Sequence, residues 1–548
     1  MTFFELVRGE MHGSLRKLLV MSSIGGISSS AILAAINAGA QAADEGKKVS
    51  LWAFALFAVS LYLFIKTQIY ITTTITGEIE AVVHRVRIRL MNQIRHSELL
   101  AVDKIGRSRI VSAITGDTAI LTQASMTLCY SVQAPILLTF VGIYVAYLSF
   151  SALVMSVIIV AISGTIFHLR NRRLTEQRAA AMEQERKLFD RLADFLDGFK
   201  EIRLHAKRSS DLFDDAVELS RAAANIKIRA QAETFKLIAS AQTYMYLLLA
   251  AVVFVVPTFS SSLGNGSTTK TTTALLFIIG ACFGLIQSIP VLLNANGAAD
   301  RLAKLDSDFH ATMREAIPAS PPTKFDKIEM RNVTFRYSKA SSDTAFEIGP
   351  IDLTLRSGEL IFITGGNGSG KSTLLLVLAG LYPPTSGEIT LDGVPVDDDS
   401  RDEYRSLFSG IFFDYHLFRK LYGISDPDPA EIDRLLRQFR LETKTGVSNS
   451  EFRTLDLSGG QRRRLALIVS LLERRPILLL DEWTAEQDPE FRRKFYEELL
   501  PTILQAGVTV VVITHDDRYL EELNLPARRV RMDEGHIVDQ RSTQPQRL

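Results

Sequence analysis

Hydrophobic residues are distributed unevenly along this chain of 548 residues. Between about residues 18 and 296 they form long uninterrupted runs, whereas from about 325 to 540 short apolar runs alternate with polar and helical-period stretches. A helix needs about 20 apolar residues to cross a bilayer, and a buried strand needs only about 4–8. The pattern therefore predicts an all-α, membrane-spanning first part and an α/β second part.

Six stretches of the first part have the length and composition expected of spans. They lie near residues 18–40, 51–75, 125–148, 151–169, 236–257 and 273–294. Segments 77–124 and 170–235 between them are rich in arginine and lysine, and the alternate connections are poor in both. Because positively charged loops stay on the cytoplasmic side, we expect both termini, these two segments and the second part to be cytoplasmic.

The two basic segments are much longer than ordinary connections, whose median is about 4–6 residues. Their helical spacing and few breakers favour spans that continue as helices into the cytoplasm and turn back near Val102–Arg109 and Phe195–His205. Those turns are candidates for contact with the second part; solvated charged helices or a separate insert are the alternatives. Polar residues inside the spans predict either a substrate path or helix–helix hydrogen bonds: Lys66, Gln68, Gln133, Gln242, Gln287 and Asn294.

A proline-rich, small-residue stretch marks the expected domain boundary. We expect a transmembrane domain over residues 1–315, a linker over 316–324 and a second domain over 325–548. The net charge of +1 gives no electrostatic argument for a nucleic-acid partner. Cys129 and Cys282 both lie in apolar runs without metal-type spacing, which favours two buried thiols.

The second part contains TGGNGSGKST at Thr364–Thr373, between a short apolar run and a helical one. This pattern and context are typical of a phosphate-binding P-loop. Glycines let the backbone N–H groups point at phosphate oxygens, the lysine reaches the terminal phosphates, and the serine hydroxyl ligates Mg²⁺. The predicted nucleotide contacts are Gly365, Asn367, Gly368, Ser369, Gly370, Lys371, Ser372 and Thr373.

Further candidate residues follow other predicted strands. The apolar run Ile477–Glu482 ends in two carboxylates; Asp481 fits a metal ligand, and Glu482 a general base that polarises the attacking water. His515 follows the apolar run Thr509–Thr514 and is placed to sense the terminal phosphate or to orient that water. Tyr337 ends an alternating strand and is a candidate for stacking on the base; without the P-loop, a surface aromatic would be the favoured interpretation.

A second anion-binding turn is predicted at Leu457–Gln461. Ser458, Gly459, Gly460 and Gln461 open a helix that begins with three arginines and runs to Leu472. A helix start of this kind offers N–H groups to an anion. Since the P-loop already forms its own phosphate site, this turn has to face something else.

Residues 325–540 resemble the nucleotide-binding domain of ABC transporters. Tyr337 resembles the A-loop aromatic, Gly365–Thr373 the Walker A, Leu457–Gln461 the ABC signature, Ile477–Glu482 the Walker B, Asp488 the D-loop aspartate and His515 the H-loop. In that family two such domains pair head to tail, and each signature closes on the ATP of the other. The resemblance implies an ATPase that uses ATP and Mg²⁺, works as a homodimer in the lipid bilayer, and has an exporter-type membrane domain of six spans with cytoplasmic extensions.

A narrower resemblance involves Glu482–Tyr496 and Phe408–Phe418. Both are similar to the cyclic-peptide exporter branch, which includes exporters of microcins and of nonribosomal peptides such as a siderophore precursor. The resemblance implies export of a peptide-like substrate across a bacterial inner membrane. Phe413 stands where the family usually has the Q-loop glutamine, and a phenyl ring neither ligates Mg²⁺ nor holds a water. Asp414 or solvent is the expected substitute.

Three alternatives share parts of this pattern. A lipid flippase or a peptide importer has the same motifs, although this sequence lacks a separate substrate-binding domain. A soluble ABC-type ATPase acting on DNA or ribosomes is disfavoured by the six predicted spans. An ATP-gated channel or sensor would hydrolyse ATP without concentrating a substrate.

Overall fold

The computed structural model describes residues 2–10, 15–46, 48, 50–255, 265–311, 324–337, 346–424, 426–516, 519 and 525–543. The chain divides into two compact units. The first comprises Met1–Asn92 and Arg107–Asp308, and the second comprises Gln93–Gly106 and Phe309–Leu548. The short segment Gln93–Gly106 therefore belongs to the C-terminal unit, although it lies between two parts of the first unit in the sequence.

Every regular element described in the first unit is a helix, as expected where lipid offers the backbone no hydrogen-bond partners. The elements are α1 Phe3–Glu10, α2 Leu15–Asp44, α3 Leu51–Arg95, α5 Arg107–Ser112, the π-helix η1 Ala113–Asp117, α6 Thr118–Leu148, α7 Phe150–Asp197, α8 Phe199–Leu204, α9 Ala206–Ala250, the π-helix η2 Ala251–Val255 and α11 Asn265–His310.

Five helical stretches among the described residues are long and apolar enough to cross a membrane, judged by length and composition. They are Arg16–Ala43, Leu51–Arg95, Arg107–Leu148, Ala206–Phe254 and Lys270–His310. The sixth predicted span falls in α7, whose described apolar part, Phe150–Ile166, is shorter. The predicted helical membrane region with long polar extensions is confirmed, since α3, α7 and α9 each continue far beyond their apolar parts.

One hydrophobic cluster joins five of the helices and η2. It contains Leu33 of α2, Val141 and Val145 of α6, Ala152 of α7, Met245 and Leu248 of α9, Val252 of η2, and Ala274, Leu275, Ile278 and Cys282 of α11. By contrast, Leu51, Trp52 and Phe54 at the start of α3 are 84%, 85% and 66% exposed. Exposed apolar side chains on a helix of this length fit a lipid-facing surface.

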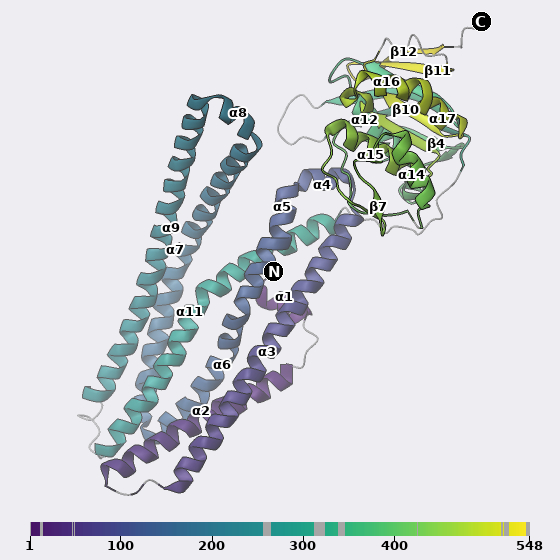
Figure 1. Cartoon of the computed structure of the whole chain (residues 1–548). Coiled ribbons are helices and arrows are strands. Elements are labelled where there is room, and N and C mark those ends of the chain that lie inside the picture. Colours follow the sequence, from purple (N-terminus) through teal and green to yellow (C-terminus); the bar gives the residue numbers. More distant parts are fainter. Residues whose placement is uncertain are drawn as a thin grey trace. The chain divides into compact units, whose positions relative to one another are not determined.

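The long extensions turn where the sequence predicted, and a glycine stands at each turn. Gly106 adopts a φ of +88° between α4 (Leu99–Ile105) and α5, a left-handed conformation that favours glycine. Gly198 separates α7 from α8, and His205 separates α8 from α9. Figure 1 shows α7 and α9 side by side along their length, joined at one end by α8. The expected turns near Val102–Arg109 and Phe195–His205 are therefore confirmed.

The second unit is built on two main sheets. The first has the order β2–β1–β4–β5 and is antiparallel, and the second has the order β12–β11–β3–β10–β9–β6, with parallel pairing from β11 to β6. The strands are β1 Lys327–Arg336, β2 Glu347–Arg356, β3 Leu360–Gly365, β4 Ser386–Leu391, β5 Val394–Pro395, β6 Phe408–Ile411, β9 Ile477–Asp481, β10 Thr509–Ile513, β11 Ala527–Asp533 and β12 His536–Thr543. A small hairpin pairs β7 Val447–Ser448 with β8 Glu451–Phe452.

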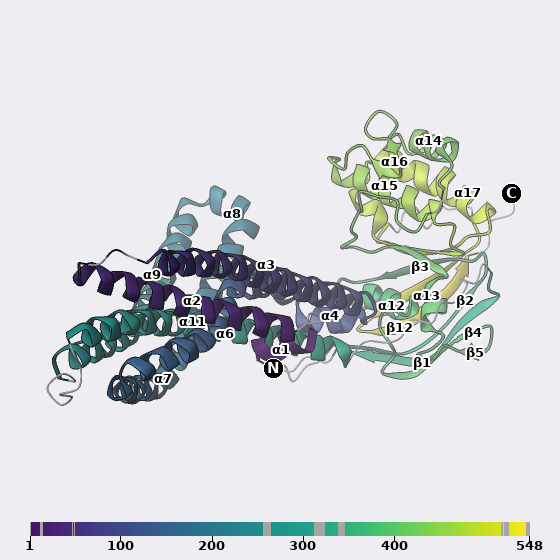
Figure 2. The ribbon, with the colours of Figure 1, turned by 90° about the horizontal axis from the view of Figure 1, so that it is seen from below.

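Helices cover both faces of the parallel strands, which explains why β9 and β10 are buried throughout. They include α12 Lys371–Leu378, α13 Arg401–Arg405, α14 Pro429–Gln438, α15 Gly459–Leu472, α16 Pro489–Lys494 and α17 Leu500–Gln505. Figure 2 shows α14 to α17 together on one side of β3, with the sheet of β1, β2, β4 and β5 on the other. The predicted linker residues 316–323 lie outside the described residues, so the proposed domain limits stay a prediction.

Candidate ATP site

The predicted P-loop joins β3 to α12 at the carboxyl edge of the parallel sheet, where ligands of such sheets bind. Together with Phe346 and Glu482, its residues line a cavity of about 320 Å³; the lining residues of the loop are Asn367, Gly368, Gly370, Lys371, Ser372 and Thr373. Gly365 and Ser369 do not line it. Ser369 is buried, and its carbonyl accepts a hydrogen bond from the Gly535 N–H over 3.1 Å.

The loop conformation requires glycine at two of the predicted positions. Gly370 has a φ of +96°, and a Cβ there would lie 2.7 Å from a methyl carbon of Ile348. Gly365 has a φ of +147°, and a Cβ there would lie 2.3 Å from the Met532 carbonyl oxygen. A side chain at Gly370 would run into the Ile348 side chain of β2, and one at Gly365 into the backbone of β11, which explains why glycine stands at both positions.

Lys371 is held in the curl of the loop. Its Nζ donates to the carbonyl oxygens of Gly365 and Gly366 over 3.0 and 2.8 Å. Burial lowers the pKa of Lys371, and the carboxylates of Glu482 and Asp481 oppose that effect. The Lys371 side chain therefore lines the cavity while the loop carbonyls hold its Nζ, and the carboxylates of Asp481 and Glu482 lie nearby.

Asp481 and Ser372 form an oxygen pair that fits Mg²⁺. Asp481 ends β9 and is 2% exposed, and its Oδ1 is buried with no hydrogen-bond partner among the described residues. Burial raises the pKa of Asp481, the neighbouring Glu482 adds to this, and a hydrogen bond from the Ser372 hydroxyl opposes it. A buried carboxylate oxygen without a partner beside a hydroxyl suits a hard cation that prefers oxygen ligands.

Glu482 and His515 come together at the ends of β9 and β10. The Glu482 Oε1 lies 3.2 Å from the His515 Nε2. Glu482 has a φ of +49°, in the left-handed region that non-glycine residues seldom occupy. Its N–H donates to the Ile513 carbonyl over 3.1 Å, which ties this strained residue to β10. Backbone strain of this kind concentrates at functional sites.

Tyr337 lies directly after β1 in an aromatic cluster. Its ring meets Phe335 and Tyr382 edge to face, with centroids 5.0 and 5.8 Å away. Its hydroxyl lies 3.4 Å from the Thr373 Oγ1 at the start of α12. The cluster thus places this predicted base-stacking residue beside the P-loop helix.

The predicted second anion site opens α15, but it is already partly capped. The Ser458 Oγ accepts from the Gln461 N–H over 3.4 Å, and the Gln461 Oε1 accepts from the Ser458 N–H over 3.1 Å. This capping box leaves the N–H groups of Gly459 and Gly460 as donors for an anion. Gly460 is also tied back, because its carbonyl accepts from the Gln487 Nε2 over 3.1 Å.

Sequence reasoning missed two buried arginines behind this turn. Arg463 and Arg464 are 2% and 9% exposed, whereas Arg462 between them and the turn is exposed. The Arg464 Nε donates to the Gln487 Oε1 over 2.8 Å, and its Nη2 to Asp488 over 2.5 Å. The sequence did contain one signal for these buried arginines, namely the acidic residues that follow β9. Arginines buried where a helix packs against that segment need carboxylate partners.

Known proteins resemble the chain in both sequence and fold. A model of the family "ABC transporter" matches residues 348–485. The ATP-binding protein SyrD of Pseudomonas syringae pv. syringae is 33% identical over 479 residues, which covers 83% of this chain and 82% of that protein. The chain belongs to the ABC transporter family. As an ABC transporter of the exporter type, it couples ATP hydrolysis in its second unit to transport.

Two further comparisons bear on this ABC exporter. A solved structure described as a bacterial Atm1-family ABC exporter with ATP bound has a TM-score of 0.77, covers 97% of this chain and 96% of its own, and is 18% identical, so it supports the fold alone. The ATP-dependent lipid A-core flippase of Burkholderia orbicola is 26% identical over 452 residues, covering 79% of this chain and 72% of that protein. Exporter fold and membrane integration follow from these similarities and the apolar helices.

In this exporter Phe413 stands after β6 with its side chain 63% exposed. Its backbone, rather than its ring, acts at the site, because a hydrogen bond from the Phe413 N–H counteracts the burial that raises the pKa of Asp481. Asp414 is exposed. The expected substitution of Asp414 or solvent for the missing glutamine stays a prediction.

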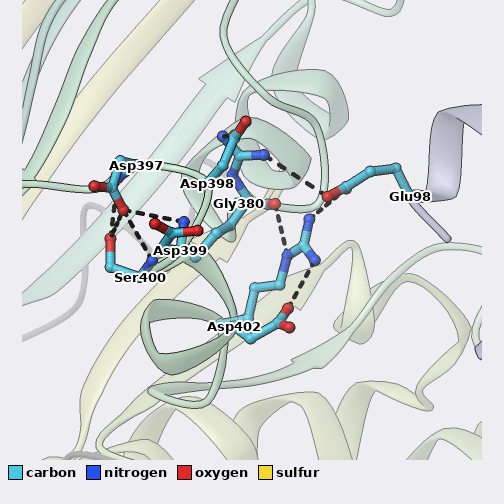
Figure 3. A network of polar contacts seen from close by, with 9 residues as sticks. Glu98, Gly380, Asp397, Asp398, Asp399, Ser400 and Asp402 are labelled. Atoms are coloured by element: carbon cyan, nitrogen blue, oxygen red, sulfur yellow. Dashed lines mark hydrogen bonds and ion pairs between the residues drawn. The ribbon is translucent and has the colours of Figure 1, made fainter. Parts of the chain in front are cut away.

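The exporter also has a charged docking point within its second unit, at the segment Gln93–Gly106. Figure 3 shows Glu98 facing the arginines of α13. The Glu98 carboxylate accepts from the Arg405 Nη2 over 2.5 Å and lies 3.7 Å from the Arg401 Nη1. Arg405 also donates through Nε to the Gly380 carbonyl over 2.8 Å. These side chains are 9–24% exposed, so the ion pairs are largely shielded from solvent.

Apolar and aromatic contacts surround this docking point. Leu99 and Leu100 of α4 pack against the hydrophobic cluster that contains Tyr382 and Tyr404. The Tyr382 hydroxyl donates to Asp103 over 3.4 Å. Since Tyr382 also contacts Tyr337, α4 is connected to the aromatic cluster beside the P-loop helix.

Proposed function

We propose that this exporter is a homodimer in which each ATP is held between the P-loop of one chain and the Ser458 turn of the other. The observation that carries the proposal is the composition of the P-loop cavity. Its lining includes Lys371, Ser372 and Glu482, and no residue of Leu457–Gln461 among the described part of the chain. One chain thus supplies the P-loop side of an ATP site, and the contacts from a Ser458 turn have to come from a second chain.

Within that half-site, the side chains have separable tasks. Lys371 and the loop N–H groups bind the phosphates, and Tyr337 binds the base by stacking. Ser372 and Asp481 would hold Mg²⁺, which neutralises charge on the phosphates when bound. Glu482 takes the proton from the attacking water, and His515 orients Glu482 through the 3.2 Å contact. Ser458 and the N–H groups of Gly459 and Gly460 donate to the terminal phosphate of the partner's ATP.

The proposed cargo is a peptide-like compound, exported across a bacterial inner membrane with the ATPase unit in the cytoplasm. The similarity of Glu482–Tyr496 and Phe408–Phe418 to the cyclic-peptide exporter branch supports this substrate class. So does the probable syringafactin export ATP-binding/permease protein SyfD of Pseudomonas syringae pv. syringae strain B728a, 33% identical over 226 residues, which cover 39% of this chain and 34% of that protein. The basic segments 77–124 and 170–235 support the orientation. A lipid substrate is the second candidate, favoured by the similarity to the flippase.

The substrate class is tested by ATPase measurements on the full chain in lipid nanodiscs. Cyclic peptides, nonribosomal siderophore precursors and lasso peptides are added separately, and lipid A and phospholipids form the comparison set. A peptide-like exporter is expected to hydrolyse ATP faster with members of the first set and to accumulate them in inside-out vesicles. Stimulation by lipids alone would replace the peptide proposal by a flippase, and stimulation without accumulation would indicate a channel or sensor.

Replacing Glu98 by arginine is expected to uncouple ATP hydrolysis from the opening of the membrane helices. The change sets a third cation against Arg401 and Arg405, and breaking a buried pair costs about 3–5 kcal/mol. ATPase activity is expected to persist, because Glu98 does not line the P-loop cavity. The measurement is the ATP-driven change in distance between spin labels at the outer ends of the spans, by electron paramagnetic resonance.

Two companion variants make this test specific. Glu403→Arg introduces the same charge at an exposed position of α13 and is expected to leave the distance change intact. Adding Arg405→Glu to Glu98→Arg restores an ion pair of reversed polarity and is expected to restore part of the movement. A full movement in Glu98→Arg alone would contradict the coupling role.

A further inference from the structure

Arg463 is buried between the Ser458 turn and the catalytic strand end. Only 2% of it is exposed, although it carries a charge. Its Nη1 donates to the Glu482 carbonyl over 2.6 Å, and its Nη2 lies 3.3 Å from the Glu486 Oε1. In return, the Arg463 carbonyl accepts from the Trp483 Nε1 over 2.9 Å. Helix α15 and the end of β9 are therefore joined by bonds in both directions.

Aromatic rings complete the surroundings of this guanidinium. Its central carbon lies 5.8 Å from the ring centroids of both Phe413 and Tyr415. A cation at such depth is stable only while its partners remain in place, and ring faces attract it without competing for its hydrogen bonds. Arg463 thus links three segments: the helix that begins at Ser458, the loop that contains Phe413, and the end of the Walker B strand.

The bond to Glu482 reaches a residue whose backbone is strained. Glu482 has a φ of +49°, and the direction of its side chain depends on that backbone conformation. Its N–H donates to the Ile513 carbonyl, and its own carbonyl accepts from the Arg463 Nη1 over 2.6 Å and from the Ala485 N–H over 3.2 Å. Removing the guanidinium would take away the shortest of these three bonds, so the Glu482 peptide would be free to shift and turn its carboxylate away from the attacking water.

We propose that Arg463 is a positioning residue that orients Glu482 of its own chain and ties it to the Ser458 turn. The inference rests on the proposed function, because in the head-to-tail dimer the Ser458 turn serves the ATP bound by the other chain. Each chain then contributes its Ser458 turn to the partner's ATP and its Glu482 to its own ATP. Through Arg463, closure of the turn on the partner's ATP would affect the Glu482 that acts on the chain's own ATP. Arg463 also contacts the ring of Phe413, which stands at the position of the Q-loop glutamine. A movement of that loop would therefore also reach Glu482 through Arg463.

Mixed dimers separate this role from simple support of the helix. Two differently tagged full chains are co-expressed, and the pair is isolated through both tags. The reference pair combines an unaltered chain with a Glu482→Gln chain, so that one base remains. In the first test pair, Arg463→Met is placed on the chain that keeps Glu482. In the second, it is placed on the chain that carries Glu482→Gln.

The proposal expects the first test pair to hydrolyse ATP about 10–100-fold more slowly than the reference, the range that a small misplacement of a catalytic group produces. It expects the second pair to match the reference, because the remaining Glu482 keeps its own Arg463. If Arg463 only supports the Ser458 turn, the second pair is the slow one, since its altered helix serves the active ATP. That result, or equal rates in both pairs, would overturn the proposal.

The Arg463→Met homodimer provides an independent measurement. Its kcat is expected to fall by the same factor while the KM for ATP and the melting temperature change little, and Arg463→Lys should recover part of the rate. The matched control, Arg462→Met, removes an exposed arginine from the same helix and is expected to behave like the unaltered chain. An unchanged kcat in folded Arg463→Met would also refute the proposal.

Failure of the dimer itself is recognised by a third pair. It joins an unaltered chain to one that carries both Glu482→Gln and Ser458→Arg. The head-to-tail arrangement expects this pair to hydrolyse ATP about 10²-fold more slowly than the reference pair, because the only remaining base acts on an ATP that faces the altered turn. Activity equal to the reference pair would refute the homodimer of the proposed function, whatever the Arg463 variants show.

Discussion

Replacing Glu482 by glutamine is expected to preserve ATP binding and to slow hydrolysis by about 10²–10⁴-fold, the usual contribution of a general base. The amide keeps the size of the side chain and a hydrogen-bond contact to His515, but it does not accept the proton of the attacking water. The cavity residues that bind phosphate are unchanged. Binding of a fluorescent ATP analogue and steady-state phosphate release measure the two effects separately.

The matched control is Glu490→Gln, an exposed glutamate of α16 in the same stretch of sequence. Its carboxylate bonds to Arg440 at the surface and lies outside the P-loop cavity. It is expected to leave turnover normal and stability nearly unchanged, because an exposed ion pair contributes little. Near-normal turnover of Glu482→Gln would rule out Glu482 as the base.

Replacing Ser458 by arginine is expected to lower hydrolysis by about 10²-fold, the scale on which loss of a preorganised donor acts. The long side chain would occupy the space in front of Gly459 and Gly460 and hold the partner's ATP away. Because the P-loop of the same chain is untouched, ATP binding by separated chains is expected to be unchanged. Turnover and the ATP-dependent association of the chains are measured together.

Loss of the cap is a separate effect of this substitution. The bond from the Gln461 N–H to the Ser458 Oγ disappears, at a cost of about 1 kcal/mol, which is too small to unfold the unit. Ser448→Arg, at an exposed position of β7, is the control for an added arginine and is expected to hydrolyse ATP normally. If Ser458→Arg hydrolyses ATP as fast as its control, the two chains do not share their ATP sites.

The sequence was most informative where chemistry depends on local spacing. The P-loop requires its glycines, lysine and serine within a few residues, so one stretch of chain predicted the curl that the structure has around Gly365 and Gly370. Apolar runs of contrasting length likewise predicted the helical and α/β parts. Proximity of Asp481, Glu482 and His515 followed from their places after buried parallel strands, because such strands end at one edge of a sheet.

Interactions between distant segments could not be predicted from local spacing or from the lengths of apolar runs. Arg463 was one of three consecutive arginines at the start of a predicted helix, and its burial depends on how α15 packs against the end of β9. The ion pairs of Glu98 join residues about 300 positions apart, a separation that hydrophobic periodicity does not encode. The apolar part of α7 was also shorter than expected among the described residues.

By itself, the sequence determined the P-loop motif, the helical membrane region and the turns near Val102–Arg109 and Phe195–His205. These features depend on residues that are neighbours in the chain or on the length of an apolar run. Only the tertiary structure decided which buried charges meet, that the Glu482 backbone is left-handed, and that Gln93–Gly106 belongs to the second unit. Those outcomes depend on contacts between residues far apart in sequence, and their energies arise only when folding removes the groups from water.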